Sequence, residues 1–103
     1  MKLQSYVIKF LEKQGFKVIN VTAATRSGEP DLLCVDLDGV AWLIEIKDRG
    51  DTLKLLQAEK LRRVAKLGHS IAMVAWSIED FKSKFDSIMK STPALPEEKP
   101  KLD

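Results

Sequence analysis

The sequence predicts a mixed α/β sandwich with the element order α-β-β-β-α-β-α. Three observations predict it: apolar residues recur at helical spacing in three segments, runs rich in β-branched residues lie between them, and an Asp-Gly pair separates two of these runs. At 103 residues the chain is long enough for one domain with one modest core. We expect residues 1–90 to form that domain.

The first elements are a helix and a strand. In KLQSYVIKFLEKQG, residues 2–15, apolar side chains recur at helical spacing and Gly15 provides a stop. FKVINVTA, residues 16–23, is rich in β-branched residues and predicts the first strand. The polar loop ATRSGEP separates it from a second strand over residues 31–36.

A hairpin links the second strand to a third strand over residues 40–47. The dipeptide Asp38-Gly39 suits the positive φ angles of a tight turn. DLDG is also similar to the start of a calcium loop, but Lys47 stands where that loop would need its final glutamate. The hairpin is therefore the better interpretation.

The rest of the chain predicts a helix, a strand, a helix and a tail. The second helix is expected over about residues 53–67, a fourth strand over residues 70–76 and a third helix over residues 78–90. Residues 91–103 contain three prolines, mixed charge and almost no apolar side chains. We expect this tail to be disordered, because it cannot bury enough apolar surface to order itself.

Composition excludes several classes of protein. No apolar run approaches the roughly 20 residues of a membrane helix, and the N-terminus lacks the features of a signal peptide, so a cytoplasmic location is expected. The single cysteine, Cys34, excludes an internal disulfide and a cysteine-rich zinc site, and we expect it to be a small buried hydrophobe. The net charge of +2 is too small to indicate nucleic-acid binding by itself.

Three charged side chains interrupt the two hairpin strands. Residues two apart on a strand point to one face, so Glu45 and Lys47 emerge together, and the hairpin brings Asp31 to the same end of the sheet. Two carboxylates at close range repel unless a cation lies between them, and oxygen-only ligands suit Mg²⁺ or Mn²⁺. Lys47 would then orient or activate a water and offset charge on a phosphate. This arrangement predicts metal-assisted hydrolysis of a phosphodiester.

A structural interpretation of the same charges stands beside the catalytic one. Asp31 follows Pro30 and could be an ordinary strand-entry residue, and Glu45 with Lys47 could be an exposed pair of opposite charges. The order of elements favours the catalytic interpretation.

The motifs EPD, residues 29–31, and EIK, residues 45–47, resemble the PD-(D/E)XK nuclease motif and its restriction-endonuclease-like αβββαβ core. A glycine before the PD pair, a glutamine in LLQAEKL and a glycine ending that helix resemble the virus-type replication-repair nuclease (VRR-NUC) branch. The resemblance covers roughly residues 4–81. It implies a mixed central sheet flanked by helices.

The resemblance also implies roles for individual residues. Asp31 and Glu45 would be metal ligands together with the Ile46 main-chain carbonyl, and Lys47 would serve the nucleophilic water. Gln57 matches the helix glutamine at the edge of the family's active site. Taken alone, Gln57 would be interpreted as an ordinary surface residue of a helix.

One position departs from the family pattern. Members usually carry a glutamate in the first helix about eleven residues before its terminal glycine, and this chain has Gln4 there. An amide is a weaker metal ligand than a carboxylate, although its oxygen can hold a water bound to the metal. The departure bears on metal affinity and on the number of metals bound.

Basic residues gather around the second predicted helix. A solvated helix face is the usual explanation, but beside a phosphate-cleaving site they favour contact with a nucleic-acid backbone. The expected nucleic-acid-binding residues are Arg26, Arg49, Lys54, Lys60, Arg62, Arg63 and Lys66.

These observations together predict an Mg²⁺-dependent endonuclease, with Mn²⁺ as a possible substitute and no small-molecule cofactor. The resemblance implies branched DNA, such as a four-way (Holliday) junction, as the substrate, and small stand-alone domains of this kind resemble phage- or virus-encoded resolvases. The alternatives are a flap or 5′-end nuclease, a restriction-type nuclease and a non-catalytic DNA-binding module on the same fold.

Cutting a junction symmetrically requires two sites, so a homodimer is expected. Large apolar residues of the fourth strand and third helix either form the dimer interface or cover the sheet. These residues are Met73, Trp76, Phe81 and Phe85.

Overall fold

The structure, a computed structural model, describes residues 2–20, 31–47, 52–53, 55–66, 69–90 and 99. The elements in chain order are α1 (Lys2–Lys13), β1 (Lys17–Asn20), β2 (Leu32–Val35), β3 (Ala41–Ile46), α2 (Leu55–Lys66), β4 (Ser70–Ala75) and α3 (Ile78–Met89). The predicted element order is confirmed, with most elements a residue or more shorter than expected. Apart from Lys99, the tail predicted to be disordered lies outside the described residues.

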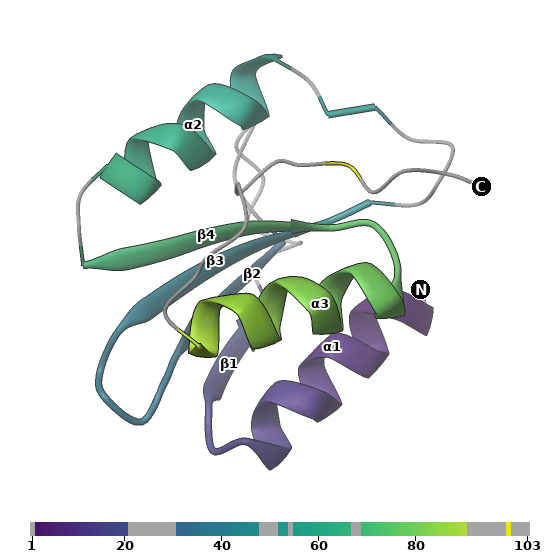
Figure 1. The fold of residues 1–103 in the computed structure, drawn as a ribbon, viewed down its shortest axis with the longest axis vertical. Coiled ribbons are helices and arrows are strands. Elements are labelled where there is room, and N and C mark those ends of the chain that lie inside the picture. Colours follow the sequence, from purple (N-terminus) through teal and green to yellow (C-terminus); the bar gives the residue numbers. More distant parts are fainter. Residues whose placement is uncertain are drawn as a thin grey trace.

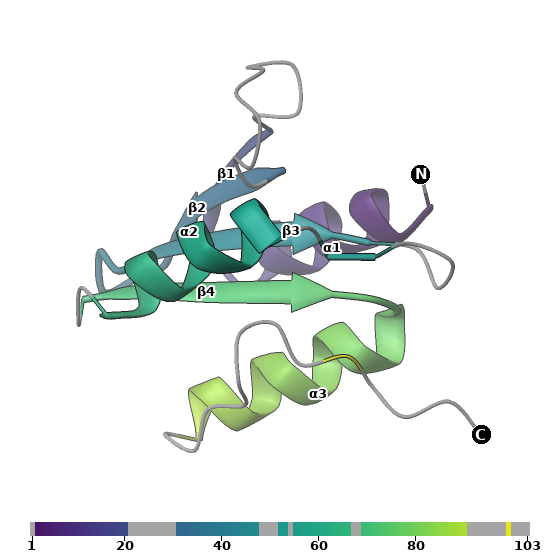
Figure 2. The same ribbon diagram turned by 90° about the horizontal axis from the view of Figure 1, so that it is seen from above.

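The four strands form one mixed sheet in the order β1-β2-β3-β4. Pairs β1–β2 and β2–β3 are antiparallel, whereas β3 and β4 run parallel. The parallel pair arises because α2 carries the chain back across the sheet between these two strands. Helices α1 and α3 cover one face and α2 covers the other, as Figures 1 and 2 show.

The main core lies between the sheet and the helices α1 and α3. Leu3, Val7 and Leu11 recur every four residues on α1 and all three are buried. Phe10 adds edge-to-face contacts with Phe81 and Phe85 of α3, at ring-centroid distances of 5.4 and 5.1 Å. These contacts join the two helices into one layer. None of the described helices is long and apolar enough to cross a membrane.

The large apolar residues considered for a dimer interface are core residues instead. Met73, Trp76, Phe81 and Phe85 have exposed fractions of 1, 4, 0 and 5%. The interface interpretation of these four residues is wrong, because side chains this deeply buried have no surface left for a partner. They cover the sheet.

The β2–β3 hairpin is organised by one carboxylate. Asp36 Oδ1 accepts hydrogen bonds from the N–H groups of Asp38 and Val40 at 2.9 and 3.0 Å, and its Oδ2 accepts from Trp42 Nε1 at 2.9 Å. Partial burial acts to raise the pKa of Asp36, but these three bonds outweigh it and the pKa lies below its ordinary value. Gly39 has a φ of 81°, as the predicted turn requires.

Cys34 is completely buried, which confirms its prediction as a small hydrophobe. Its Sγ donates to the Trp42 carbonyl oxygen at 3.6 Å. Burial, with a smaller contribution from the charge of Asp36, raises the pKa of this thiol to about 12. The thiol therefore stays protonated at neutral pH and is a poor nucleophile.

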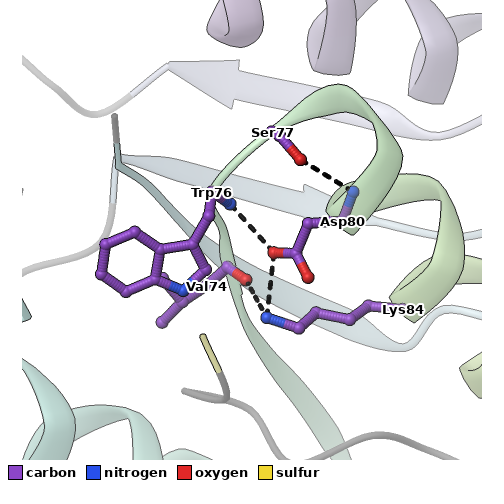
Figure 3. Close-up of polar contacts among 5 residues, drawn as sticks. All are labelled: Val74, Trp76, Ser77, Asp80 and Lys84. Atoms are coloured by element: carbon purple, nitrogen blue, oxygen red, sulfur yellow. Dashed lines mark hydrogen bonds and ion pairs between the residues drawn. The ribbon is translucent and has the colours of Figure 1, made fainter. Parts of the chain in front are cut away.

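A buried ion pair connects the start of α3 to β4 (Figure 3). Lys84 Nζ donates to Asp80 Oδ2 at 3.0 Å and to the Val74 carbonyl oxygen at 2.8 Å. The Trp76 N–H donates to the same Asp80 oxygen at 3.0 Å, and the Asp80 N–H donates to Ser77 Oγ, the N-cap of α3. The pair therefore fixes the path of the chain where it leaves β4.

Candidate active site

The hairpin register places Asp31 opposite Glu45. Leu32 pairs with Ile44, so Asp31, one residue earlier, faces Glu45, one residue later. The Ile46 N–H donates to Asp31 Oδ2 at 2.9 Å and so points toward β2. Hydrogen-bonded and non-hydrogen-bonded pairs alternate along an antiparallel ladder. Since Ile46 is at a hydrogen-bonded position, Asp31 and Glu45 form a non-hydrogen-bonded pair, in which opposite side chains lie closest together.

Strand alternation sets the face of the sheet on which the three charged groups lie. Trp42, Ile44 and Ile46 are in the core beside α1 and α3, so Glu45 and Lys47 point to the α2 side. There Lys47 Nζ lies 3.3 Å from Glu45 Oε2. The structure therefore brings together the three charged residues that the sequence singled out.

Burial and the neighbouring charges both act on the Glu45 carboxylate. It is only 4% exposed. Burial, and then the negative charge of Asp31, raise the pKa of Glu45, while Lys47 and a hydrogen bond from the Asp31 N–H lower it less strongly. The net shift is upward. Burial is its largest cause, with a smaller contribution from Asp31, and a further cation would stabilise the charged form of Glu45.

The raised pKa predicts how Glu45 affects stability without metal. A carboxyl whose pKa is raised in the folded state contributes stability that is present below its ordinary pKa of 4.5 and is lost as pH rises through the folded-state pKa. Glu45→Gln has no titrating carboxyl at this position, so it should not lose this stability as pH rises. In EDTA, denaturant unfolding between pH 4 and 8 should show a smaller decline for the variant than for the wild type. Glu59→Gln, at an exposed position of α2, is the control; an unchanged decline in Glu45→Gln would contradict the prediction.

The donors at this site fit a hard divalent cation. Asp31 and Glu45 supply carboxylate oxygens, and the Ile46 carbonyl faces the same side as the Ile46 N–H, toward Asp31. In the described part of the chain no third histidine, cysteine, aspartate or glutamate joins them. An all-oxygen set of this size, completed by water, suits Mg²⁺ or Mn²⁺ and does not suit zinc.

Gln4 lies half-buried in the first turn of α1. This helix covers the face of the sheet opposite Glu45. Its N-terminal end is nevertheless at the end of the sheet where β3 and β4 finish, as both ribbon views show. The position is compatible with an approach to the metal ligands around the end of the sheet.

The remaining predicted residues belong to α2 and to the loops. Gln57 lies in the first turn of α2, and its side chain is outside the described part of the structure. Lys60 is half-buried on α2, whereas Arg62, Arg63 and Lys66 are exposed there. The other predicted nucleic-acid-binding residues, Arg26, Arg49 and Lys54, lie outside the described residues.

One feature of the site was missed from the sequence. The Asp31 carboxylate takes the place of a strand partner for the Ile46 N–H, beyond the last pair of the β2–β3 ladder. The available signal was the position of Asp31 directly before a strand and after a proline, where a side chain often replaces a backbone partner.

No protein-family model and no curated protein matches the chain. A solved structure described as a "VRR_NUC domain" is similar to it, with a TM-score of 0.71 and 28% sequence identity. The similarity covers 82% of this chain and 91% of that one. The fold class predicted from the sequence is thereby confirmed, and the similarity supports the predicted resemblance to VRR-NUC domains, which are nuclease-type domains.

Proposed function

We propose that the protein is a metal-dependent, structure-selective DNA endonuclease that hydrolyses phosphodiester bonds in branched DNA such as four-way junctions. The observation that carries this proposal is the meeting of Asp31, Glu45 and Lys47 at one end of a hairpin, inside a nuclease-type fold. The proposed nuclease domain spans residues 1–90.

The proposed chemistry divides between a metal and the chain. Asp31, Glu45 and the Ile46 carbonyl would hold Mg²⁺ or Mn²⁺, which when bound polarises a phosphate and acidifies water. The Lys47 ammonium orients the attacking water and stabilises negative charge that develops on the phosphate. Its ion pair with Glu45, at 3.3 Å, holds it beside the carboxylates.

The proposed DNA surface includes α2, which covers the same face of the sheet as the charged cluster. Arg62, Arg63 and Lys66 are exposed on it, and Lys60 is half-buried. Cationic side chains that contact phosphates position a nucleic acid without reading its bases. Together with Arg26, Arg49 and Lys54, they favour recognition of backbone shape over base sequence.

The proposal is tested by incubating the purified protein with labelled linear duplex, flap, splayed and four-way DNA, with and without Mg²⁺. Paired nicks in four-way DNA that require the metal are expected, with junction affinity that falls steeply as salt is raised. Light scattering should give a homodimer. Failure to cut any DNA with Mg²⁺ or Mn²⁺ would overturn the proposal, and a monomer that makes one nick near a flap would place the protein in the flap-nuclease class.

Restoring the family's acid at the first-helix position should lower the metal requirement. Gln4→Glu adds a charged oxygen donor where the wild type has an amide. The Mg²⁺ or Mn²⁺ concentration for half-maximal cleavage should fall, by about tenfold if the new carboxylate contributes ~1.4 kcal/mol to metal binding. An unchanged metal concentration would mean that Gln4 lies outside the metal's surroundings. Ser5→Glu, at the next position and exposed, adds the same single negative charge and is the control.

A further inference from the structure

The exposed face of α1 carries a row of lysines. Lys2, Lys9 and Lys13 have the spacing i, i+7 and i+11, which places them within about 40° of one another around the helix. All three are exposed, and the buried stripe of α1 is on the other side of the helix. This row therefore presents positive charge to the solvent.

A hollow in the surface lies beside the first two of these lysines. It has a volume of about 450 Å³, and its lining includes Lys2, Tyr6 and Lys9. Tyr6 is half-buried and stacks on Phe10 with 6.1 Å between the ring centroids, so packing holds its ring in place. Ammonium groups and a tyrosine hydroxyl can all donate hydrogen bonds to an anion.

No described acid pairs with the lysines of the hollow. Glu12 is the only acidic residue of α1, and neither Lys2 nor Lys9 forms an ion pair in the described part of the chain. Lys9 and Lys13 are like charges at i, i+4 spacing, which destabilises a helix. An anion bound along the row would offset this repulsion.

The neighbouring helix α3 has no such row, although it covers the same face of the sheet. Its exposed Lys82 lies three residues after Glu79 and four residues before Asp86, so opposite charges alternate there. Such alternation is typical of a solvated helix face. Of these two helices, only α1 therefore has an excess of positive charge on its exposed side.

Both α1 and α2 begin at the end of the sheet that carries the candidate active site. The chain enters α2 after β3, whose last residues are Glu45 and Ile46, and the N-terminal end of α1 lies at the same end of the sheet (Figures 1 and 2). The two helices cover opposite faces of the sheet. Their basic surfaces therefore lead away from the active-site end on two different sides.

A straight duplex that follows one of these surfaces leaves the other empty, whereas two arms of a branched DNA diverge from one point. Lysines contact phosphates regardless of base sequence, so the row on α1 suits the backbone of an arm. We propose that Lys2, Lys9 and Lys13 bind the phosphate backbone of a second arm of a branched DNA whose first arm lies on α2. This inference rests on the proposed function and identifies residues that distinguish a branched substrate from a linear one.

Two double variants that lower the net charge equally test the role of the row. Lys2→Gln with Lys9→Gln removes two charges from α1. Lys82→Gln with Lys90→Gln removes two exposed charges from α3 and its C-cap, and is the control. For labelled four-way DNA without divalent metal, the α1 variant should reduce the slope of log affinity against log salt by about two, as expected for two lost phosphate contacts. The α3 variant should leave that slope unchanged, and Tm should show that both variants are folded.

Linear duplex DNA identifies the second arm. The α1 variant should bind it with the wild-type slope, because a linear duplex is expected to contact α2 alone. An unchanged slope for four-way DNA, or an equal reduction for linear and four-way DNA, would overturn the assignment of a second arm to α1. A wild-type protein that cuts no DNA with Mg²⁺ or Mn²⁺ would instead refute the proposed function itself.

Discussion

Replacing Asp31 or Glu45 with alanine should abolish Mg²⁺-dependent cleavage while the protein stays folded. Each change removes an anionic oxygen from the only pair of carboxylates that the described hairpin strands bring together. Loss of several kcal/mol of transition-state stabilisation corresponds to a decrease in rate of about a thousandfold or more. Lys47→Ala should slow cleavage severely, because the ammonium beside Glu45 is lost. Single-turnover cleavage of labelled four-way DNA measures the rate.

Two control variants separate the effect of lost charge on cleavage from the effect of a disturbed structure. Asp31→Asn keeps an oxygen that can accept from the Ile46 N–H but removes the charge, so it should be inactive and as stable as the wild type. Asp38→Ala removes an exposed carboxylate from the hairpin turn and should remain fully active. Full activity in Asp31→Ala or Glu45→Ala would show that the cluster is not the catalytic site.

The largest effect on stability is expected from breaking the Asp80–Lys84 pair. Lys84→Met leaves the Asp80 carboxylate buried without its cation and leaves the Val74 carbonyl oxygen without its donor. Removal of one partner from a buried ion pair costs about 3–5 kcal/mol. Urea unfolding followed by circular dichroism should show this loss for Lys84→Met.

A double-mutant cycle identifies the source of that loss. Asp80→Leu combined with Lys84→Met removes both charges, so the double variant should be less destabilised than the sum of the single variants. It should still be less stable than the wild type, because the Trp76 N–H and the Val74 carbonyl oxygen lose their partners at about 1–3 kcal/mol each. Lys82→Met, exposed on the same helix, should change stability by less than about 0.5 kcal/mol. Strict additivity of the single changes would contradict the coupling.

Local patterns were sufficient to predict the elements of the fold. On α1 the apolar spacing of Leu3, Val7 and Leu11 matches one buried stripe. The Asp38-Gly39 pair identifies the hairpin, since Gly39 adopts the positive φ that such a turn needs. These patterns predict structure because each depends on a few residues that are close in the sequence.

The same local patterns did not reveal the buried polar groups. Asp80 and Lys84 have the i, i+4 spacing of an ordinary solvated helix pair. They are buried only because α3 packs against β4, which is a tertiary relation. The Asp36 carboxylate similarly binds Trp42 across the hairpin, and a residue at the end of a strand gives no local sign of that contact.

The candidate site could be predicted from the sequence in part. Strand alternation and the hairpin turn suffice to place Asp31, Glu45 and Lys47 at one end of one face. The depth of burial of Glu45 depends on what packs over that face, so the raised pKa could not be predicted. The roles of Gln4 and Gln57 stay predictions, because they rest on the family resemblance.

The side chains of α3 also influence how this protein can associate with other chains. In the described sheet β4 is an edge strand. Successive residues of a strand direct their backbone groups to opposite sides, and the Ala75 carbonyl faces β3, so the backbone N–H and C=O groups of Val74 and Trp76 face outward. An edge with unpaired N–H and C=O groups is a template for strand addition and aggregation. Asp80 and Lys84 occupy two of these groups, the Trp76 N–H and the Val74 carbonyl oxygen. The end of β4 nearest the active site is therefore a poor template for a strand from a second molecule, which disfavours joining two copies into one continuous sheet there. A change that frees this edge would favour fibrous aggregates.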